Sequence, residues 1–375
     1  MNNPFEKLFG SFFGTKDTSV IGIDIGPSSA KLVQLKKKGG RAILETYGEI
    51  ALGPYNNTEV GRSTVLGIDK IVEAIKDLLR ESNATTTKSG MSIPIGSSLI
   101  KFIELPQMGD KQLAEMIPLE ARKYIPVPIS EVTLDYWIIP KNDNIVSEFE
   151  NGAKTQSVEP AHMTEVLLVV IHNDALEKNR QISSLVPLEN SFSEIEIFSA
   201  IRAVMDPSLS PQMILDIGSG STKVYIVERG ILRSSHIINR GSQDITLAIS
   251  KSMGLTFDEA EKIKRQNGIV SSKDNANLVE VSSLTVDYIF METGRVILNY
   301  EKKYGKKISK IFLTGGGVLL KGLKERAEVS FNTPVQIADP FAKVEYPAFL
   351  ENVLKSAGPE FAVAIGLAIR KLQGI

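Results

Sequence analysis

The sequence predicts an α/β protein with a duplicated core of two lobes, and three observations carry this prediction. Two segments that contain Asp24 and Asp216 repeat each other 192 residues apart. Each has an apolar run, an Asp-x-Gly turn with small polar residues, and a second apolar run that starts at a Lys. A third apolar run, residues 311–313, ends in a triple glycine, and residues 65–79 have the apolar spacing of a helix. Each repeated segment therefore predicts a strand, a tight turn and a returning strand.

The composition excludes several classes of function. Of the 375 residues, 42% are apolar and 23% are charged, which is typical of a globular protein with a large core. Lys and Arg number 43 and Asp and Glu number 44, so we expect no nucleic acid bound through bulk charge. The chain has no Cys, which excludes disulfides, zinc thiolates and thiol catalysis, and its three His residues have no metal-ligand spacing.

The apolar runs are too short to cross a membrane. Spanning needs about 18 consecutive apolar residues, whereas residues 166–171 and 361–369 read as a core strand and a core helix. Charged residues and a glycine interrupt the start of the chain, so it lacks the pattern of a signal peptide. We therefore expect the cytoplasm as the location.

The two repeated turns have the chemistry of a phosphate site. Glycine lets backbone N–H groups approach an anion closely, and Ser and Thr hydroxyls add donors. A carboxylate at the end of a buried strand can hold Mg²⁺, usually through water. Two such turns that face each other would hold a polyphosphate from both sides, and the alternative is a pair of ordinary β-hairpins. The expected contributors are Asp24, Gly26, Ser28, Ser29 and Lys31 in the first segment and Asp216, Gly218, Ser219, Gly220, Ser221 and Lys223 in the second.

The triple glycine is a third candidate contact. Thr314 follows the apolar run and precedes Gly315, Gly316 and Gly317. Three glycines after a buried strand allow a flat ligand or its phosphates to lie against the backbone. A simple strand-to-helix turn is the alternative, although it would need fewer glycines.

In this order and spacing, the three loops resemble those of the ATPase superfamily that contains actin, chaperones and sugar kinases. Residues 196–203 resemble its first connecting helix, and residues 358–368 resemble its second, where small residues let helices pack closely. Within that superfamily, the chain resembles the PilM family of type IV pilus assembly proteins and, more distantly, the FtsA family of cell-division proteins. The narrower resemblance rests on residues 23–34, 120–136, 241–246 and 260–264.

The resemblance implies an actin-like fold with two ribonuclease-H-like lobes and an inserted FtsA-type β-α-β-β subdomain in the first lobe. In the inserted subdomain we expect a helix through Tyr124 with Asp110 as its N-cap. Pro118 interrupts it, so we expect a kink or two short pieces there. The expected boundaries are an N-terminal amphipathic segment 1–16, a first lobe 17–206 (core 17–98 and 172–206, inserted subdomain about 99–171, with the C-terminal helix 355–375), and a second lobe 207–354 (core 207–240 and 306–354, small subdomain about 241–305).

The resemblance also implies ATP and Mg²⁺ as cofactors. Asp24 and Asp216 would hold the hydrated metal, and the glycines and hydroxyls of both turns would donate to the phosphates. Lys31 would contact the β- and γ-phosphates, with Lys223 as its counterpart. Glu196 would orient the attacking water, a role that needs no covalent chemistry.

The base and ribose would contact other residues. The resemblance assigns Glu261 and Lys264, which share a helix face, to ribose and adenine, whereas the alternative for this pair is a solvated ion pair. The glycines 315–317 would lie under the base. Pro27 stands where relatives often have Ser, so a hydroxyl and an N–H donor are absent beside the γ-phosphate. We therefore expect at most a weak Mg²⁺-dependent ATPase, in which binding matters more than turnover.

The resemblance also implies that the chain binds another protein. In PilM-like proteins, the groove between the first core subdomain and the inserted one holds a short N-terminal cytoplasmic peptide of PilN, an inner-membrane protein. We therefore expect a scaffold that is peripheral at the inner membrane and links that complex to pilus ATPases or other pilus components. Residues 5–13 carry an apolar helical stripe that could contact a membrane, dock into a partner or pack on its own domain. The polar residues 142–163 form a partner-binding loop or a tolerated insertion.

Two other functions remain open at this level. A small-molecule kinase of the same superfamily would need a catalytic carboxylate in the inserted region, where Asp135 is the candidate. A filament-forming protein like actin or FtsA is the second alternative, and the sequence contains nothing that excludes it.

Overall fold

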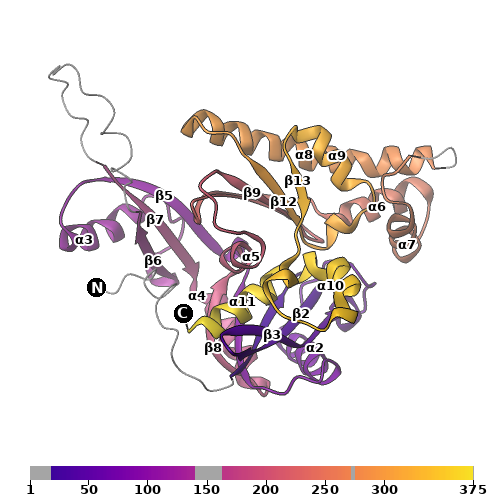
Figure 1. Ribbon diagram of the computed structural model, residues 1–375, viewed down its shortest axis with the longest axis horizontal. Helices are drawn as coiled ribbons and strands as arrows, with labels where there is room; N and C mark the ends of the chain where they lie inside the picture. Colours follow the sequence, from indigo (N-terminus) through magenta and orange to yellow (C-terminus); the bar gives the residue numbers. More distant parts are fainter. Residues whose placement is uncertain (1–17, 140–162, 272–274, 375) are drawn as a thin grey trace. The chain divides into compact units, whose positions relative to one another are not determined.

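The computed structural model describes residues 18–139, 163–271 and 275–374 (Figure 1). The chain divides into two compact units, the first formed by residues 1–94 and 178–375 and the second by residues 95–177. Residues 1–17 contain the predicted N-terminal segment 1–16 with its apolar stripe, and residues 140–162 contain nearly all of the predicted polar loop 142–163. Both predictions lie outside the described residues.

The first unit contains two five-stranded sheets with the same topology. The first sheet has the order β3-β2-β1-β4-β8 and the second has the order β11-β10-β9-β12-β13. In each sheet, three antiparallel strands are followed by two parallel ones. The strands of the first sheet are β1 (Ser19–Ile25), β2 (Ser29–Lys38), β3 (Arg41–Ala51), β4 (Lys88–Ile93) and β8 (Glu189–Ile195). Those of the second are β9 (Gln212–Ile217), β10 (Thr222–Glu228), β11 (Ile231–Ile238), β12 (Lys310–Thr314) and β13 (Val335–Ile337).

Helices cover both faces of the first sheet. One face packs against α2 (Ile68–Glu81) and α4 (Asn173–Leu185), through residues such as Ile21 and Leu32 of the strands and Ile75 and Ile182 of the helices. The opposite face packs against α5 (Glu196–Val204) and α11 (Ala362–Gln373). This alternation follows from the period of two in a strand, because successive side chains point to opposite faces.

The contact between α5 and α11 depends on small residues. A Cβ atom at Gly366 of α11 would lie 2.0 Å from the backbone oxygen of Ser199 on α5. Gly22 of β1 is equally close to the backbone of Ala364. A larger side chain at either glycine would separate these backbones. The C-terminal segment forms α10 (Glu351–Ala357), the 3₁₀ turn η7 (Gly358–Phe361) and α11 rather than one helix, because Pro359 has no N–H donor.

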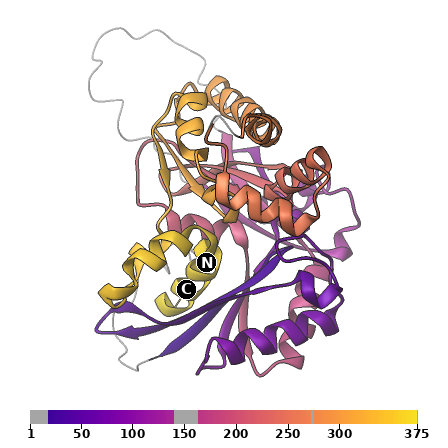
Figure 2. The same ribbon diagram turned by 90° about the vertical axis from the view of Figure 1, so that its right-hand side faces the viewer.

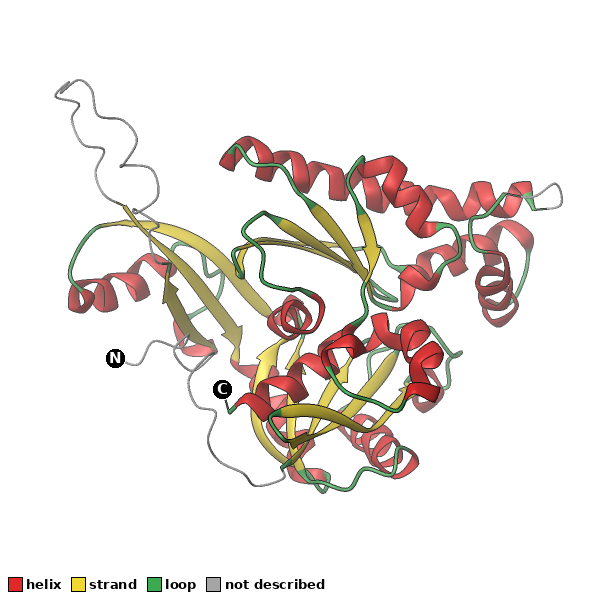
Figure 3. Cartoon of the chain, viewed as in Figure 1, coloured by secondary structure: helices red, strands yellow, loops and turns green. Residues whose placement is uncertain are grey.

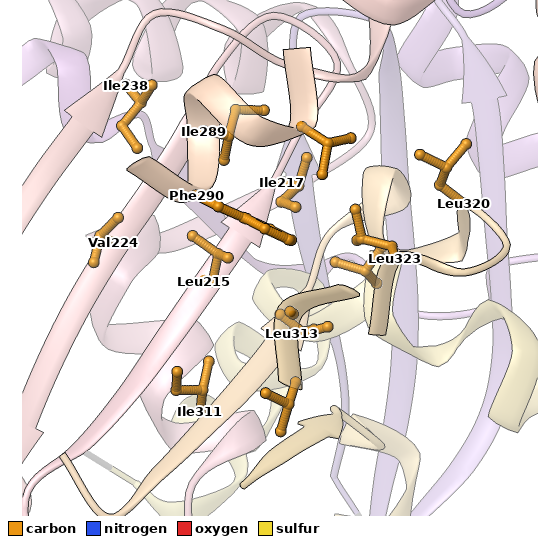
Figure 4. Packing of buried hydrophobic residues seen from close by; sticks show 14 of the residues in the cluster. Leu215, Ile217, Val224, Ile238, Ile289, Phe290, Ile311, Leu313, Leu320 and Leu323 are labelled. Atoms are coloured by element: carbon orange, nitrogen blue, oxygen red, sulfur yellow. The ribbon is translucent and has the colours of Figure 1, made fainter. Parts of the chain in front are cut away.

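The second sheet has its core on the face covered by α6 (Ser242–Met253), α7 (Phe257–Asn267), α8 (Ala276–Tyr304) and α9 (Leu323–Phe331). Helices α6, α7 and α8 are drawn in orange in Figure 2. Figure 4 shows Phe290 of α8 among the side chains of Leu215 and Ile217 of β9, and Leu313 of β12 lies in the same cluster. Burying these side chains contributes roughly 1.5–3 kcal/mol each, so this core holds the strand that carries Asp216 in place.

In its described residues, the second unit contains a three-stranded antiparallel sheet and the α-helix α3, and it ends within α4 (Figure 3). Its elements are β5 (Ser98–Pro106), α3 (Asp110–Ala121), β6 (Val132–Ile138) and β7 (Met163–His172), and the order in space is β5-β7-β6. The predicted β-α-β-β insertion is confirmed. The predicted break into two pieces at Pro118 is wrong, because α3 continues through it. The N-cap is Gly109 rather than Asp110, and α3 ends at Ala121 rather than Tyr124. Leu113, Ile117 and Ala121 anchor α3 to the sheet, and this packing outweighs the backbone hydrogen bond that proline removes.

The fold class is therefore the predicted one, an α/β protein with a duplicated core and an insertion in its first half. None of the helices within the described ranges is long and apolar enough to span a bilayer. The boundaries of the two lobes and of the small subdomain stay predictions.

Candidate functional site

The two Asp-Gly hairpins have the same local geometry. In the first, the N–H of Gly26 donates to the carbonyl of Ser29 at 3.0 Å, and in the second the N–H of Gly218 donates to the carbonyl of Ser221 at 3.0 Å. The strand register places Asp24 directly opposite Lys31 and Asp216 directly opposite Lys223. The seven-residue spacing in the sequence is therefore a cross-strand pair at the turn end of each hairpin.

The second hairpin forms a buried charge cluster with α5. The Nζ atom of Lys223 lies 2.6 Å from Oε2 of Glu196 and 3.6 Å from Oδ2 of Asp216. Burial lowers the pKa of Lys223, but the charges of the two carboxylates outweigh it and hold this pKa above its ordinary value. Burial and the charge of Glu196 raise the pKa of Asp216, although Lys223 opposes this rise. Glu196 occupies the first turn of its helix, so the connecting helix delivers its carboxylate to the turn of the second sheet.

Asp24 of the first hairpin faces the same cluster. Burial and the charge of Glu196 raise the pKa of Asp24, while the charges of Lys31 and Lys223 and a hydrogen bond with Ser92 lower it. Lys31 in turn acts on the pKa of Asp216. The two aspartates therefore lie within electrostatic reach of one carboxylate and two ammonium groups that they share.

Lys31 has partners that its counterpart lacks. Its Nζ donates to Oγ of Ser29 at 2.6 Å and lies 2.9 Å from Oε1 of Glu49 on β3 and 3.8 Å from Oε2 of Glu360 in η7. A hydrogen bond joins the carboxyl groups of Glu49 and Glu360. Burial and the charge of Glu49 raise the pKa of Glu360, whereas Glu49 itself, despite its burial, has a pKa lowered by Lys31.

The triple glycine lies against the second hairpin. Gly315 has φ of +86°, and a Cβ there would lie 2.4 Å from Oδ1 of Asp216. A Cβ at Gly317 would lie 2.3 Å from the side chain of Ile217, and one at Gly316 would lie 3.3 Å from the carboxyl of Glu360. Only glycine permits the approach at positions 315 and 317, and a positive φ also favours it at Gly315. The loop is therefore built closely around the aspartate.

Glu261 and Lys264 form a buried ion pair, not a solvated one. Their charged atoms lie 2.6 Å apart, and their side chains are 13% and 8% exposed. Both contact Oγ1 of Thr246, and Lys264 also donates to the carbonyl of Ser242. Ser242 donates its N–H to the carbonyl of Gly218 in the second turn, which links this pair to the hairpin.

A segment before α2 connects the two turns. The N–H of Ser63 donates to Oε1 of Gln243 at 2.9 Å, and the hydroxyls of Ser63 and Ser219 are 3.0 Å apart. The N–H of Thr64 donates to the carbonyl of Pro27 in the first turn. This segment therefore contacts each hairpin through one hydrogen bond, and a third hydrogen bond joins it to Gln243 of α6.

The carboxylates of Asp24 and Asp216 suit a metal ion that keeps most of its water ligands. Within the described ranges, no group of three or more His, Asp or Glu side chains is arranged to hold a metal ion. Two aspartates with raised pKa values are nevertheless poorly compensated carboxylates, and hard oxygen ligands of this type suit Mg²⁺. The two carboxylates of Asp24 and Asp216 therefore fit a hydrated Mg²⁺ and would hold it through its water.

The structure thus brings the predicted residues of both turns, the glycine loop and Glu196 into one connected region. Sequence patterns missed Glu49, Glu360, Ser63 and Gln243. Glu49 contacts Lys31 from the neighbouring strand β3, Glu360 contacts Lys31 from η7, and Ser63 and Gln243 both contact Ser219. Glu360 and Gln243 stand within the recognised stretches 358–368 and 241–246, but no spacing marks them as partners of Lys31 and Ser219. The kinase candidate Asp135 is exposed and accepts a hydrogen bond from the backbone N–H of its neighbour Tyr136.

Comparison with known proteins agrees with this fold. The structure superimposes on the "PilM-PilN type IV pilus biogenesis complex" with a TM-score of 0.76 at 21% identity, over 95% of this chain and 99% of that one. It matches MreB 5 of Spiroplasma citri bound to AMPPNP with a TM-score of 0.50 at 11% identity, over 95% and 96% of the chains.

Curated relatives by sequence are FtsA cell-division proteins. The protein from Neisseria meningitidis serogroup B is 29% identical over 184 residues, which are 43% of each chain. The one from Bacillus subtilis is 21% identical over 375 residues, covering 89% of this chain and 81% of that one. The chain spans less than half the length of the first three of these relatives.

The duplicated sheets and the two facing Asp-Gly hairpins define an actin-like protein of two lobes. The model of a particular family within this class, described as "Type IV pilus assembly protein PilM", matches residues 22–372. The chain therefore belongs to the PilM family.

Proposed function

We propose that this chain binds ATP with Mg²⁺ between its two Asp-Gly hairpins and serves as a nucleotide-dependent scaffold in type IV pilus assembly. One observation carries the nucleotide part: Asp24 and Asp216, from equivalent strand ends, share the charges of Glu196, Lys31 and Lys223. Two hairpins without a common ligand would have no reason to place buried charged groups near one another. The metal of a bound nucleotide would compensate the carboxylates, and its phosphates would compensate the ammonium groups.

The proposed contacts divide by ligand group. The turns would donate backbone N–H and hydroxyl groups to the phosphates, because glycine exposes the former and serine supplies the latter. Glu261 and Lys264 would contact the ribose and base, and the glycine loop would lie under the base. The phosphate contacts are assigned to Gly26, Ser28, Ser29, Lys31, Gly218, Ser219, Gly220, Ser221 and Lys223, and the base contacts to Gly315, Gly316 and Gly317.

When bound, Mg²⁺ would neutralise phosphate charge next to Asp24 and Asp216. Glu196 would orient the attacking water, and Lys223 would then exchange its contact with Glu196 for a phosphate oxygen. Pro27 provides neither an N–H nor a hydroxyl at the first turn. We therefore propose weak hydrolysis and a function that depends mainly on binding.

Calorimetry with ATP and Mg²⁺ tests this proposal. The wild-type chain should bind ATP, and Asp216→Ala should weaken binding at least about tenfold, which corresponds to about 1.4 kcal/mol. Asp135→Ala is the matched control, since this exposed aspartate lies in the other unit, and it should bind as the wild type does. Equal affinity of the Asp216 and Asp135 variants would contradict the nucleotide site.

The proposed partner is the N-terminal cytoplasmic peptide of PilN, which would place the chain in the cytoplasm at the inner membrane. The support is the family and the likeness to a solved PilM-PilN complex. Contacts with pilus ATPases or other pilus components would follow from such a scaffold. Fluorescence anisotropy with a labelled PilN peptide, measured with and without ATP, tests both binding and its coupling to nucleotide. A scrambled peptide is the control, and equal binding of both peptides would contradict the assignment.

A further inference from the structure

A buried tyrosine close to the charge cluster has a hydroxyl without a partner. Tyr225 of β10 has an exposed fraction of 0% and is among the largest fully buried side chains of the described residues. Its hydroxyl finds no hydrogen-bond partner within the described part of the chain. A buried donor in this condition is unfavourable, and native proteins pair nearly all such groups.

The strand register places this hydroxyl on the side of the proposed nucleotide site. Tyr225 lies two residues after Lys223, so both side chains point to the same face of the sheet. Val224 and Ile226 point to the other face, where they join the hydrophobic core. The phenol is therefore not part of that core and shares its face with the cluster of Lys223, Asp216 and Glu196.

The charged groups that act on Tyr225 are carboxylates, which accept hydrogen bonds. Burial raises the pKa of Tyr225 well above its ordinary value, and the charges of Glu196, Asp216 and Asp24 raise it further. The phenol is therefore neutral and keeps its proton. A neutral O–H among carboxylates is a donor that can satisfy any one of them without adding a charge.

Packing alone does not explain the hydroxyl. Phenylalanine would fill nearly the same volume and would leave no buried donor unpaired. Tyr300 of α8 provides the contrast, because its hydroxyl is also buried but donates to Oε2 of Glu228 at 3.1 Å. The hydroxyl of Tyr225 is thus an unused hydrogen-bond donor beside the proposed nucleotide site, whose contacts would change when a ligand binds.

We propose that Tyr225 is a positioning residue that donates to the carboxylate of Glu196 once Lys223 has moved to the phosphates of a bound nucleotide. In the present structure Lys223 occupies Oε2 of Glu196 at 2.6 Å. A phosphate would draw the ammonium away, and Glu196 would lose this donor. The hydroxyl of Tyr225 replaces it with a neutral hydrogen bond, which keeps the carboxylate oriented and leaves its negative charge available to a water molecule.

This inference rests on the proposed nucleotide function, and the test separates the two. Tyr225→Phe and the control Tyr300→Phe are compared in the full chain by thermal unfolding without nucleotide and by calorimetry with ATP and Mg²⁺. Tyr225→Phe should unfold at the wild-type temperature or above it, because no hydrogen bond is lost, and should bind ATP about tenfold more weakly. Tyr300→Phe should show the reverse, a lower unfolding temperature and unchanged ATP affinity.

A double-mutant cycle identifies the acceptor. In a Glu196→Gln background, the additional change Tyr225→Phe should alter ATP affinity by less than about twofold, because the partner carboxylate is gone. Wild-type affinity of Tyr225→Phe, a lower unfolding temperature of this variant, or its full effect in the Glu196→Gln background would each overturn the inference. A wild-type chain that binds no ATP would overturn the proposed function itself, and this inference with it.

Discussion

The hairpins β1–β2 and β9–β10 have the same backbone geometry but differ in the residues that their lysines contact. Both turns close with the same hydrogen bond at 3.0 Å, and both place an aspartate opposite a lysine. Lys223 contacts Glu196 and Asp216 within the buried cluster. Lys31 instead contacts Glu49, whose side chain is 38% exposed, and Glu360.

This difference indicates that the duplication preserved geometry while the two charges took different roles. Lys223 compensates buried carboxylates, so it supports the site before any ligand arrives. Lys31 is held by acidic residues at the border of the site, and a phosphate would compete with them for it. The following experiments test that division.

The largest expected effect is on stability when each lysine is replaced by Met. Lys223→Met leaves Glu196 and Asp216 buried without their cation, so we expect a loss of about 3–5 kcal/mol in the free energy of unfolding. Lys31→Met removes a pair that reaches solvent, so we expect a loss of about 1 kcal/mol. Urea unfolding of the nucleotide-free chain measures both. Equal losses would show that the two lysines are equivalent.

A second effect concerns the metal. Asp24→Asn and Asp216→Asn should each lower ATP affinity about tenfold or more in the presence of Mg²⁺. With EDTA in place of Mg²⁺, both variants should bind ATP no more weakly than the wild type, because each removes a negative charge near the phosphates. Calorimetry under both conditions checks this. A variant that loses as much affinity in EDTA would have lost its fold or a direct contact, not a metal ligand.

A third, smaller effect is the pH dependence of the partners of Lys31. Glu360 has a raised pKa, caused by burial and by Glu49, so its contribution to stability is present below its ordinary pKa of 4.5 and is lost as the pH rises through the raised value. Glu360→Gln cannot ionise and should therefore become more stable relative to the wild type as the pH increases. Chemical unfolding from about pH 4 to pH 8 measures this difference.

Glu49 provides the matched comparison with the opposite sign. Burial raises its pKa, but Lys31 outweighs burial and lowers it, so its contribution is present above pH 4.5 and is lost as the pH falls through the lowered value. Glu49→Gln should be less stable than the wild type at neutral pH, and the difference should shrink in acid. The same trend in both variants would contradict the assignment of the two carboxyls.

The local part of the site could be predicted from the sequence because hairpins are local structures. The spacing from Asp24 to Lys31 crosses one tight turn, so the pairing of the strands brings the two residues opposite each other. The repeat at Asp216 and Lys223 then predicted a second copy. The shared fold class followed from these copies and from the resemblance that they carry.

The remaining contacts could not be predicted in this way. Ser63 and Glu360 reach the hairpins only through the packing of segments that are distant in the sequence, and no spacing reports such contacts. Glu49 lies directly opposite Lys31 on the neighbouring strand β3, but an irregularity between Gln34 and Leu35 shifts the register of that pairing, so spacing alone does not reveal it. The helix through Pro118 shows the same limit, since the packing of Ile117 and Ala121 outweighs a local rule. The unpaired hydroxyl of Tyr225 is likewise invisible in the sequence, where it reads as one apolar strand residue among others.

The smallest expected effect concerns the turn residues Pro27 and Ser219, which are equivalent in the two hairpins. Pro27→Ser should lower stability by about 0.4–1 kcal/mol, because proline restricts the unfolded chain. It should also raise the rate of ATP hydrolysis severalfold, because serine provides an N–H and a hydroxyl beside the phosphates.

Phosphate release under saturating ATP measures this rate, and Pro27→Ala separates the two donors since it restores only the N–H. Equal gains in both variants would assign the effect to the backbone, and a gain in the serine variant alone would assign it to the hydroxyl. An unchanged rate in both variants would show that the donors missing at Pro27 do not limit hydrolysis.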